Sequence, residues 1–376
     1  MEKKYDVAAF VWPAYTGDEL RTRMFWPKGI GEWEAVQNAA PSFEGHLWPR
    51  KPLWGYVNEA DESVMEMEID EAASHGVSVF IYDWYWYDRR PFLENCLNDG
   101  YLKAKNNGKV KFYLMWANHD IGYSWDIRNS DTEGDYTLEQ LGKSMLYTGE
   151  VDEAEFDRLT SRLIEKYFCH ESYYRIDGKP VFMIFSLPVL IKGLGGVKQT
   201  EKALHRLKEK CKEAGLGGLH LQLNLHPVCY EIREGERLLP IEEVITRLGF
   251  DSTTNYQMLN ACTERERDYA AMVGCAAAGW ERLDKESPVP YFPQVSVGWD
   301  NTPRFQRPRK YIITGGTPER FKAALQKAKA FLDARPDRHP LITINSWNEW
   351  TEGSYLQPDD IFGYGYLDAV KEVFGE

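Results

Sequence analysis

The sequence of 376 residues lacks paired cysteine spacings and long apolar runs. Its six cysteines are scattered without a C-x-x-C pair or a zinc-like spacing, so we expect free thiols in a reducing compartment. No apolar stretch approaches the roughly 20 residues of a membrane-spanning helix. The apolar run after MEKKYD ends at Pro13, too early for a signal peptide. These absences predict a cytoplasmic protein without a membrane span, although a chain trimmed of its signal would look the same.

Basic residues are also in deficit. Lys and Arg total 45 against 58 Asp and Glu, which gives a formal net charge of −13. Nucleic acids and anionic membranes are bound by concentrated Lys and Arg, and the sequence has no basic stripe. The stretches GLGGVK and GLGGLH lack the G-x-G-x-x-G order of a dinucleotide site. We therefore expect no nucleic-acid partner and no cofactor.

Short apolar runs, by contrast, recur along the chain and alternate with helical patterns. We expect strands at residues 7–12, 77–84, 111–117, 180–186, 220–225, 250–256, 291–299 and 340–347. Helical patterns fall at residues 61–75, 152–168, 200–215, 317–334 and 365–374, with Thr200 and Thr317 as capping residues. This alternation predicts an α/β fold, a single (β/α)8 TIM-type parallel barrel over residues 1–376, with an open doubly wound sheet as the alternative. The long connections 13–60 and 118–150 are expected to build the site at the carboxyl ends of the strands.

The residues at the expected strand ends are aromatic, amide-bearing or acidic. They include Trp12, Asp83, Trp84, Trp116, Asn118, His119, Asn224, Tyr256, Trp299, Asp300 and Asn301. In a parallel barrel these ends meet on one face, where binding and catalytic residues lie. Aromatic rings suit the apolar face of a sugar ring, and amides and carboxylates suit its hydroxyls. The mixture predicts an oligosaccharide or polysaccharide substrate.

Two simpler interpretations apply to some of these residues. The segment YDWYWYD alternates, so one set of its side chains faces inward and the other outward, and part of it is expected to be core. His119, Asp120 and Asp300 are residue types that bind metals, but their spacing does not require them to converge. No metal site is predicted.

Two glutamates lie three positions apart in INSWNEWTEGSYLQPDD, residues 344–360, directly after the last expected strand. Glycosidic cleavage needs one carboxylic acid to protonate the departing oxygen and one ionised carboxylate. Neighbouring like charges raise one of two pKa values, so a close pair supplies both forms near neutral pH. Glu349 and Glu352 are therefore the expected catalytic residues, with Asn348 and Trp350 beside the substrate. The alternative is a solvated surface turn.

Four motifs occur in an order that resembles the WbsX-type family of bacterial polysaccharide loci. They are WANHD (116–120), RIDGKPVFMIF (175–185), GWDNTPR (298–304) and NSWNEWTEGSYLQPD (345–359). That family is related to glycoside hydrolase family 99, whose characterised members are endo-acting α-mannosidases on (β/α)8 barrels. The resemblance implies a hydrolase for an α-linked, mannose-like or related sugar in a bacterial polysaccharide or glycan.

The resemblance also implies a role for each glutamate. Glu349 would deprotonate the 2-hydroxyl of the substrate, which attacks the anomeric carbon to give a 1,2-anhydro sugar. Glu352 would protonate the leaving oxygen and later deprotonate the incoming water. The outcome is retention without a covalent enzyme intermediate, unlike the ordinary carboxylate nucleophile.

Two other functions stay open from the sequence. WbsX-type proteins have also been labelled glycosyltransferases, which would place the chain in O-antigen or capsular polysaccharide biosynthesis, although it shows no D-x-D motif after a strand. A non-catalytic carbohydrate-binding protein would keep the same aromatic residues. Polysaccharide-locus members often read W-A-N-E-N-W where this chain reads WANHD, which leaves the identity of the sugar open.

Overall fold

The computed structural model describes residues 5–17, 19–122, 125–127, 145–225, 231–262, 266–305 and 311–375. Parallel strands run through its centre in the order β12-β9-β8-β4-β2-β1-β14-β13. They are β1 (Asp6–Val11), β2 (Val79–Tyr87), β4 (Lys111–Trp116), β8 (Lys179–Ile184), β9 (His220–Asn224), β12 (Ser252–Thr254), β13 (Gln294–Ser296) and β14 (Leu341–Asn345). Each lies within three residues of an expected strand at either end, and β12 and β13 are shorter than expected.

The sheet curls until its first and last strands approach each other. The amide of Thr253 in β12 donates to the carbonyl of Pro290 at 2.9 Å, and the amide of Phe292 donates to the carbonyl of Thr253 at 2.8 Å. Tyr291, just before β13, thereby pairs in parallel with Thr253. The strands form a nearly closed parallel barrel, which confirms the predicted fold class over an open doubly wound sheet.

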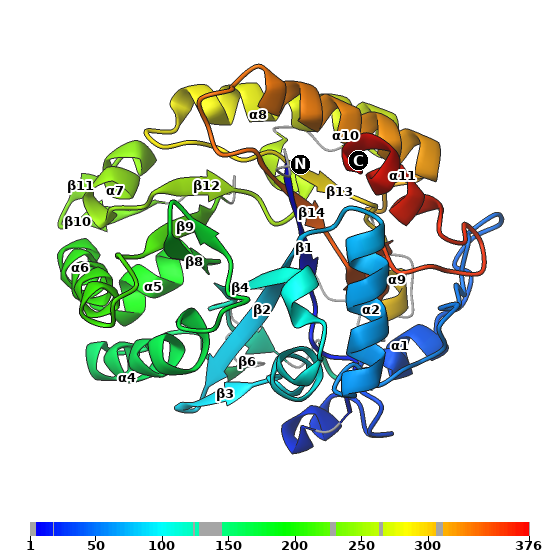
Figure 1. Ribbon diagram of the computed structural model, residues 1–376, viewed down its shortest axis with the longest axis horizontal. Coiled ribbons are helices and arrows are strands. Elements are labelled where there is room, and N and C mark those ends of the chain that lie inside the picture. The colour runs from blue at the N-terminus through cyan, green and yellow to red at the C-terminus, as the bar shows by residue number, and fades with distance from the viewer. Residues whose placement is uncertain are drawn as a thin grey trace.

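Helices surround the strands on the outside of the barrel (Figure 1). They are α2 (Glu62–Ser74), α4 (Glu153–Leu163), α5 (Leu187–Gly193), α6 (Val197–Glu213), α7 (Ile241–Leu248), α8 (Tyr269–Glu286), α10 (Pro318–Asp333) and α11 (Gly365–Phe374). Thr317 caps α10 as predicted. The predicted cap Thr200 is wrong, because α6 begins after Gly196 and the Thr200 hydroxyl donates to the Gly196 carbonyl from within the first turn. The helix therefore begins about one turn earlier than predicted, and its first residue, Val197, is buried.

The side chains of β2 decide which residues reach the interior. All nine residues of β2 are buried, because one face fills the barrel and the other meets the outer helices. Successive side chains alternate between these faces. Trp84 donates to Glu94 at 2.7 Å and Trp86 donates to Glu155 of α4 at 2.6 Å, so these two indoles belong to the outer layer. Asp83 consequently points to the interior.

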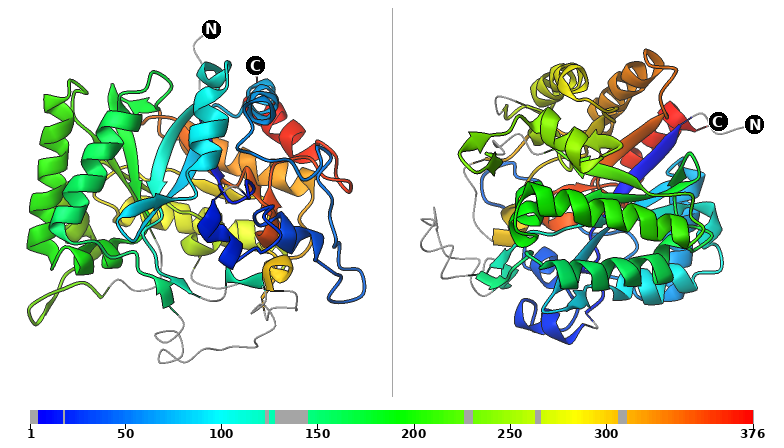
Figure 2. Two further views of the ribbon diagram at one scale, coloured as in Figure 1. Left: turned by 90° about the horizontal axis from the view of Figure 1, so that it is seen from below. Right: turned by 90° about the vertical axis from the view of Figure 1, so that its left-hand side faces the viewer.

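Two long connections extend from the carboxyl ends of β1 and β4. The first, residues 12–61, contains the 3-10 turn η1 (Leu20–Met24) and the short helix α1 (Trp33–Gln37), and it is the blue segment on one side of the barrel in Figure 2. The second begins in the hairpin β5 (Ile121–Gly122) and β6 (Met145–Tyr147); residues 123, 124 and 128–144 of it lie outside the described part.

Short strands complete the chain, namely β3 (Arg90–Phe92), β7 (Arg175–Ile176), β10 (Arg233–Glu234) and β11 (Arg237–Leu238). Among the described residues, no helix is both long enough and apolar enough to cross a membrane.

Candidate active site

A cavity of about 210 Å³ lies at the carboxyl ends of the barrel strands. Its lining consists of Trp12, Asp83, Tyr85, Met115, Ala117, His119, Trp125, Phe185, Tyr256, Gln257, Asn260, Arg304, Glu349 and Glu352. These residues come from strand ends and the loops that follow β1, β2, β4, β8, β12, β13 and β14. Rings form one part of the wall and acidic groups another, so the cavity has an aromatic side and an anionic side.

The two glutamates project from a short hairpin after β14. Strand β15 (Asn348–Glu349) pairs with β16 (Ser354–Tyr355), and the 3-10 turn η9 (Trp350–Glu352) joins them. Gly353 ends this turn with a φ of 59°, and a Cβ there would lie 3.0 Å from the Cβ of Asp300, so glycine suits both the backbone and the close approach. Ser346 Oγ accepts the amide of Glu349 at 2.8 Å and fixes the start of the hairpin.

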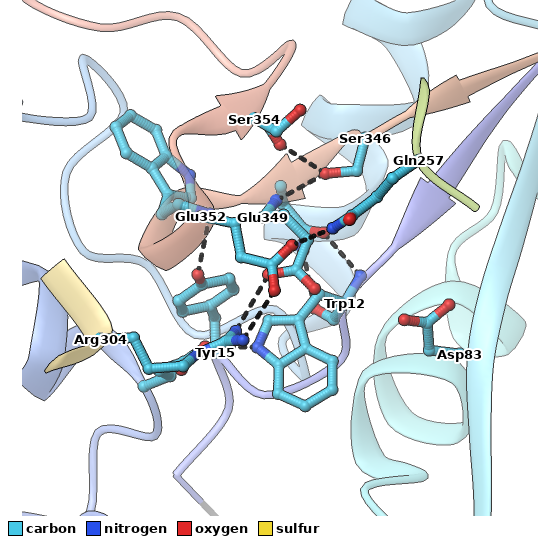
Figure 3. A network of polar contacts seen from close by, with 12 residues as sticks. Trp12, Tyr15, Asp83, Gln257, Arg304, Ser346, Glu349, Glu352 and Ser354 are labelled. Carbon is cyan, nitrogen blue, oxygen red and sulfur yellow. Dashed lines mark hydrogen bonds and ion pairs between the residues drawn. The ribbon is translucent and has the colours of Figure 1, made fainter. Parts of the chain in front are cut away.

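A single guanidinium joins both glutamates (Figure 3). Arg304, from the four-residue helix α9 (Thr302–Phe305), donates from Nη1 to Glu352 Oε1 at 2.8 Å and from Nη2 to Glu349 Oε2 at 3.2 Å. Its Nε donates to Glu32 Oε1 at 3.0 Å. One cation therefore serves three buried carboxyl groups, which leaves an excess of negative charge when all three are ionised.

Burial and mutual repulsion set the protonation of the pair. Burial raises the pKa of Glu349 well above its ordinary value and the charge of Glu352 raises it further, while Arg304 lowers it. Burial also raises the pKa of Glu352, and Arg304 again opposes the shift. Two adjacent acids of this kind titrate as a unit and retain one proton towards neutral pH. The pair can therefore present one acid and one base at the same time.

Each glutamate has a second, neutral partner. Gln257 Nε2 donates to Glu352 Oε2 at 2.7 Å. The hydroxyl of Tyr256 lies 3.0 Å from Glu349 Oε1 and 3.0 Å from Asp83 Oδ2. Every carboxylate oxygen of the pair thus has one hydrogen-bonding partner, which fixes both side chains in place.

The opposite wall is a cluster of rings. The centroid of Trp12 lies 5.7 Å from that of Tyr85 and 5.2 Å from that of Trp125, in edge-to-face geometry. The imidazole of His119 packs edge-on against Tyr85 at 5.6 Å. Burial lowers the pKa of His119, so this ring is neutral near neutral pH. An uncharged ring wall facing carboxyl groups suits a ligand with one apolar and one hydroxylated face.

The side chain of Asn348 ties the first strand to the glutamate hairpin. Its Oδ1 accepts the amide of Trp12 at 2.7 Å, and its Nδ2 donates to the carbonyl of Trp12 at 2.9 Å. Nδ2 also contacts the buried carboxyl group of Glu59 at 2.9 Å. Trp12 and Glu349 are therefore held in a fixed relation, although they belong to opposite ends of the chain.

The structure brings part of the predicted site together. Trp12, Asp83, His119, Tyr256, Glu349 and Glu352 all line the cavity. The other predicted residues do not line it, and they are Trp84, Trp116, Asn118, Asn224, Trp299, Asp300, Asn301, Asn348 and Trp350.

Most of these nine residues have structural contacts instead. Asn118 accepts from the amide of Ser186 and donates to its carbonyl, and Asn224 accepts the amide of Tyr256 at 2.8 Å. Trp116, like Trp84, faces the outer layer, where it packs against Phe156 of α4. The aromatic and amide types were recognisable from the sequence, but their direction depends on the strand face.

The predicted residues that lie in loops are next to the residues that line the cavity but do not line it themselves. Asp300 accepts from His46 at 2.6 Å and from Trp48 at 2.9 Å, which anchors the first long connection. Trp350 stacks on Tyr355 with centroids 3.8 Å apart. The neighbours Trp299 and Asn301 are half-buried at the edge of this region.

The predicted site residues did not include Tyr85, Trp125, Gln257, Asn260 and Arg304, although Tyr85 and Gln257 stand at expected strand ends. Arg304 was visible as the last residue of GWDNTPR, and a cation inside a motif otherwise rich in aromatic and acidic residues was the available signal. Gln257 directly follows Tyr256, so it shared the same strand-end signal. In the part of the chain that the structure describes, no three His, Cys, Asp or Glu side chains are placed to hold a metal ion.

Together, the fold and the cavity define a parallel (β/α)8 barrel with a buried glutamate pair at the carboxyl ends of its strands. The model of the family described as "Glycosyltransferase WbsX" matches residues 7–370. The chain therefore belongs to the WbsX family, as its motifs indicated.

Curated relatives in sequence are longer than this chain. The protein is 25% identical over 361 residues to "Uncharacterized protein WxcX" from two strains of Xanthomonas campestris pv. campestris. The alignment covers 93% of this chain and 47% of that protein, so the chain spans about half the length of these relatives.

Solved structures share the barrel. A structure described as "Glycoside hydrolase-like protein" has a TM-score of 0.62 and 16% identity, with 100% of this chain and 95% of that chain covered. The GH99 endo-alpha-mannosidase of Bacteroides thetaiotaomicron, in complex with bis-tris-propane, has a TM-score of 0.54 and 14% identity, with 98% and 95% covered. At these identities the likeness concerns the fold.

Proposed function

We propose that the protein is a retaining glycoside hydrolase that cleaves an α-linked, mannose-like or related sugar in a bacterial polysaccharide or glycan. The carrying observation is that Glu349 and Glu352 face the same ring-walled cavity and share one guanidinium. The N-E-W-x-E order of the hairpin, membership of the WbsX family and a barrel shared with glycoside hydrolase structures support the proposal.

In the first step of the proposed reaction, Glu349 removes the proton of the 2-hydroxyl. The freed oxygen attacks the anomeric carbon, the glycosidic bond breaks, and Glu352 gives its proton to the departing oxygen. In the second step Glu352 takes a proton from water, which attacks the anomeric carbon of the 1,2-anhydro sugar. The three-membered ring opens, and its oxygen recovers the proton from Glu349. Two inversions give net retention.

The contacts of the pair suit this exchange of protons. The negative charge moves from Glu349 to Glu352 in the first step, and Arg304 contacts both carboxyl groups, so the charge keeps its counter-ion throughout. Gln257 can present either its amide nitrogen or its carbonyl oxygen to Glu352. It can therefore bond to the ionised and to the protonated form of the residue that alternates between base and acid.

The test compares Glu349→Gln and Glu352→Gln on aryl α-glycosides with good and poor leaving groups. We expect both variants to lose about 10²- to 10⁴-fold in kcat/KM on poor leaving groups, because each removes a proton-transfer group. Glu352→Gln should lose least when the leaving group needs no protonation. A 2-deoxy substrate should not be cleaved, since it has no 2-hydroxyl to attack. Glu242→Gln, on the outer helix α7, is the matched control.

If both glutamine variants hydrolyse as well as the wild type, the proposal is wrong. The family description keeps a glycosyltransferase as the second candidate, and metal-dependent binding of a sugar nucleotide in calorimetry would favour it. Sugar binding without turnover that survives loss of either glutamate would indicate a carbohydrate-binding protein.

A further inference from the structure

The hydroxyl of Tyr256 lies between two buried carboxyl groups. Its oxygen is 3.0 Å from Asp83 Oδ2 and 3.0 Å from Glu349 Oε1, and both acids are at most 3% exposed. A phenol has one hydrogen to donate. It can donate to one of the two carboxyl groups, and the other can bond to its oxygen only by supplying a hydrogen of its own. Two hydrogen bonds at this hydroxyl therefore require a proton on Asp83 or on Glu349.

The surroundings indicate which acid holds that proton. Glu349 also accepts from Arg304 through its second oxygen, which favours its ionised form. Among the described residues, nothing bonds to Oδ1 of Asp83, and no ion pair involves this side chain. An ionised Asp83 would be a buried charge with a single hydrogen bond, a state that costs several kcal/mol. The neutral form of Asp83 avoids that cost.

We infer that Asp83 is a proton-holding positioning residue: its Oδ2–H donates to Tyr256, whose hydroxyl donates to Glu349 Oε1 and keeps Glu349 ionised. This role rests on the proposed function of Glu349 as a base, whereas the location of the proton does not. The line of groups runs from the end of β2, through the loop after β12, to the hairpin after β14. In Figure 3, Asp83 lies to the right of Glu349 and Glu352.

The pKa shifts of Asp83 and Tyr256 have the direction that this arrangement requires. Burial raises the pKa of Asp83 well above its ordinary value, the Tyr256 hydroxyl lowers it, and the charge of Glu352 raises it. Burial also raises the pKa of Tyr256, so the phenol keeps its hydrogen. The other titratable groups around these three residues are Tyr15, Glu32, Tyr85, His119, Arg304 and Glu352. Of these, Arg304 supplies positive charge, and it contacts Glu349 rather than Asp83.

The first experiment locates the proton without measuring activity. Infrared difference spectra at pH 7 subtract each variant from the wild type, so the bands of unaffected buried acids cancel. We expect the carboxylic-acid C=O band of the wild type to be lost in Asp83→Asn and kept in Glu349→Gln. A band lost in Glu349→Gln but kept in Asp83→Asn, or no such band in either difference, overturns the inference. Because the spectra report the protonation of Asp83 and not turnover, this test is valid even if the protein hydrolyses no glycoside.

The second experiment uses the pH profile of kcat/KM, whose acidic limb reports the base of the free enzyme. Asp83→Asn places an amide donor where the O–H donor was, so we expect the acidic limb to stay in place. Asp83→Ala leaves Tyr256 without that donor and should lose about ten- to a hundredfold in kcat/KM. If Asp83 were ionised in the wild type, Asp83→Asn would remove a negative charge and move the limb to lower pH by about one unit or more. That shift contradicts the inference.

Tyr256→Phe checks the link between the two acids. Glu349 then loses a donor to its ionised form, so its pKa and the acidic limb should move to higher pH by about one unit. Tyr113→Phe is the matched comparison, since it removes a buried hydroxyl that bonds to Gln222 and not to Asp83 or Glu349. Its limb should not move. Equal limbs in Tyr256→Phe and the wild type would show that Tyr256 does not act on Glu349.

Discussion

Arg304 determines how the acids of the cavity coexist. Its three nitrogen atoms contact Glu32, Glu349 and Glu352, each of which is less than 10% exposed. A carboxylate in such a place is tolerated only when paired or protonated. The guanidinium, planar and permanently charged, has enough donors to satisfy three acceptors at once, which a lysine amine at the end of a flexible chain would do with poorer geometry.

Arg304→Met should therefore destabilise the fold in a pH-dependent way. We expect the free energy of unfolding to fall by about 3–5 kcal/mol at pH 7.5, because the buried glutamates that are ionised lose their counter-ion. Without Arg304 the pKa values of Glu349 and Glu352 rise further above their unfolded values. Groups with raised pKa stabilise the fold at low pH and lose this effect as pH rises, so the deficit should shrink on acidification. Urea unfolding at pH 5.5 and 7.5 measures it.

Arg282→Met is the control for this substitution. Arg282 pairs with Glu286 on the outside of α8, where a salt bridge contributes little, so we expect a change of roughly 0.5 kcal/mol or less. An Arg304→Met protein as stable as the wild type at pH 7.5 would contradict the pairing described for the cavity.

At the scale of elements, the strands were more predictable than the site. Strands such as β8 and β14 are almost wholly buried and consist mainly of apolar residues, so composition alone predicts their positions, whereas β12 consists of Ser and Thr. The direction of a side chain is harder to predict. Asp83 and Trp84 are neighbours in β2, yet Asp83 faces the cavity and Trp84 faces the outer layer. Arg304 lies in the short helix α9 after β13, and the side chains that it contacts come from residues far away in the sequence. Contacts between residues so far apart in the sequence leave no local sequence pattern from which they could be predicted.

Helix α8 packs closely against a turn beside the cavity at Gly279. A Cβ on Gly279 would lie 1.9 Å from the carbonyl oxygen of Ala261, at the end of the 3-10 turn η8 (Met258–Ala261) that follows Gln257. Gly279→Ala must push η8 aside, and we expect a loss of about 1–3 kcal/mol in unfolding free energy. Gly274→Ala in the same helix meets nothing within 4 Å and should stabilise by up to about 1 kcal/mol. Chemical denaturation of both variants gives the comparison; equal effects would contradict it.

For the whole molecule, the buried acids predict an unusual dependence of stability on pH. Burial raises the pKa of Glu68 from 4.5 to about 7, and it raises the pKa of Glu59 in the same direction. The folded state then binds more protons than the unfolded state between these values, so stability falls as pH rises from about 4.5 to about 7. Glu349, Glu352 and Asp83 have shifts of the same sign.

Glu68→Gln tests this expectation. The amide has no proton to lose, so the variant should show a shallower decline of melting temperature between pH 4.5 and 7.5 than the wild type. The difference corresponds to about 3 to 4 kcal/mol at most, because the pKa rises from 4.5 to about 7 and each pKa unit is worth roughly 1.4 kcal/mol. Glu242→Gln, an exposed substitution, should follow the wild-type curve. Parallel curves for Glu68→Gln and the wild type would mean that Glu68 has an ordinary pKa when folded.

The bond pair between Asn348 and the backbone of Trp12 has a consequence for protein engineering. The orientation of the glutamate hairpin depends on its hydrogen bonds to the end of β1, so the hairpin cannot be transferred to another protein by itself. A designer who grafts residues 346–355 onto another barrel must also transfer the end of β1 with its tryptophan, or the acids will be present in the new host but wrongly aimed.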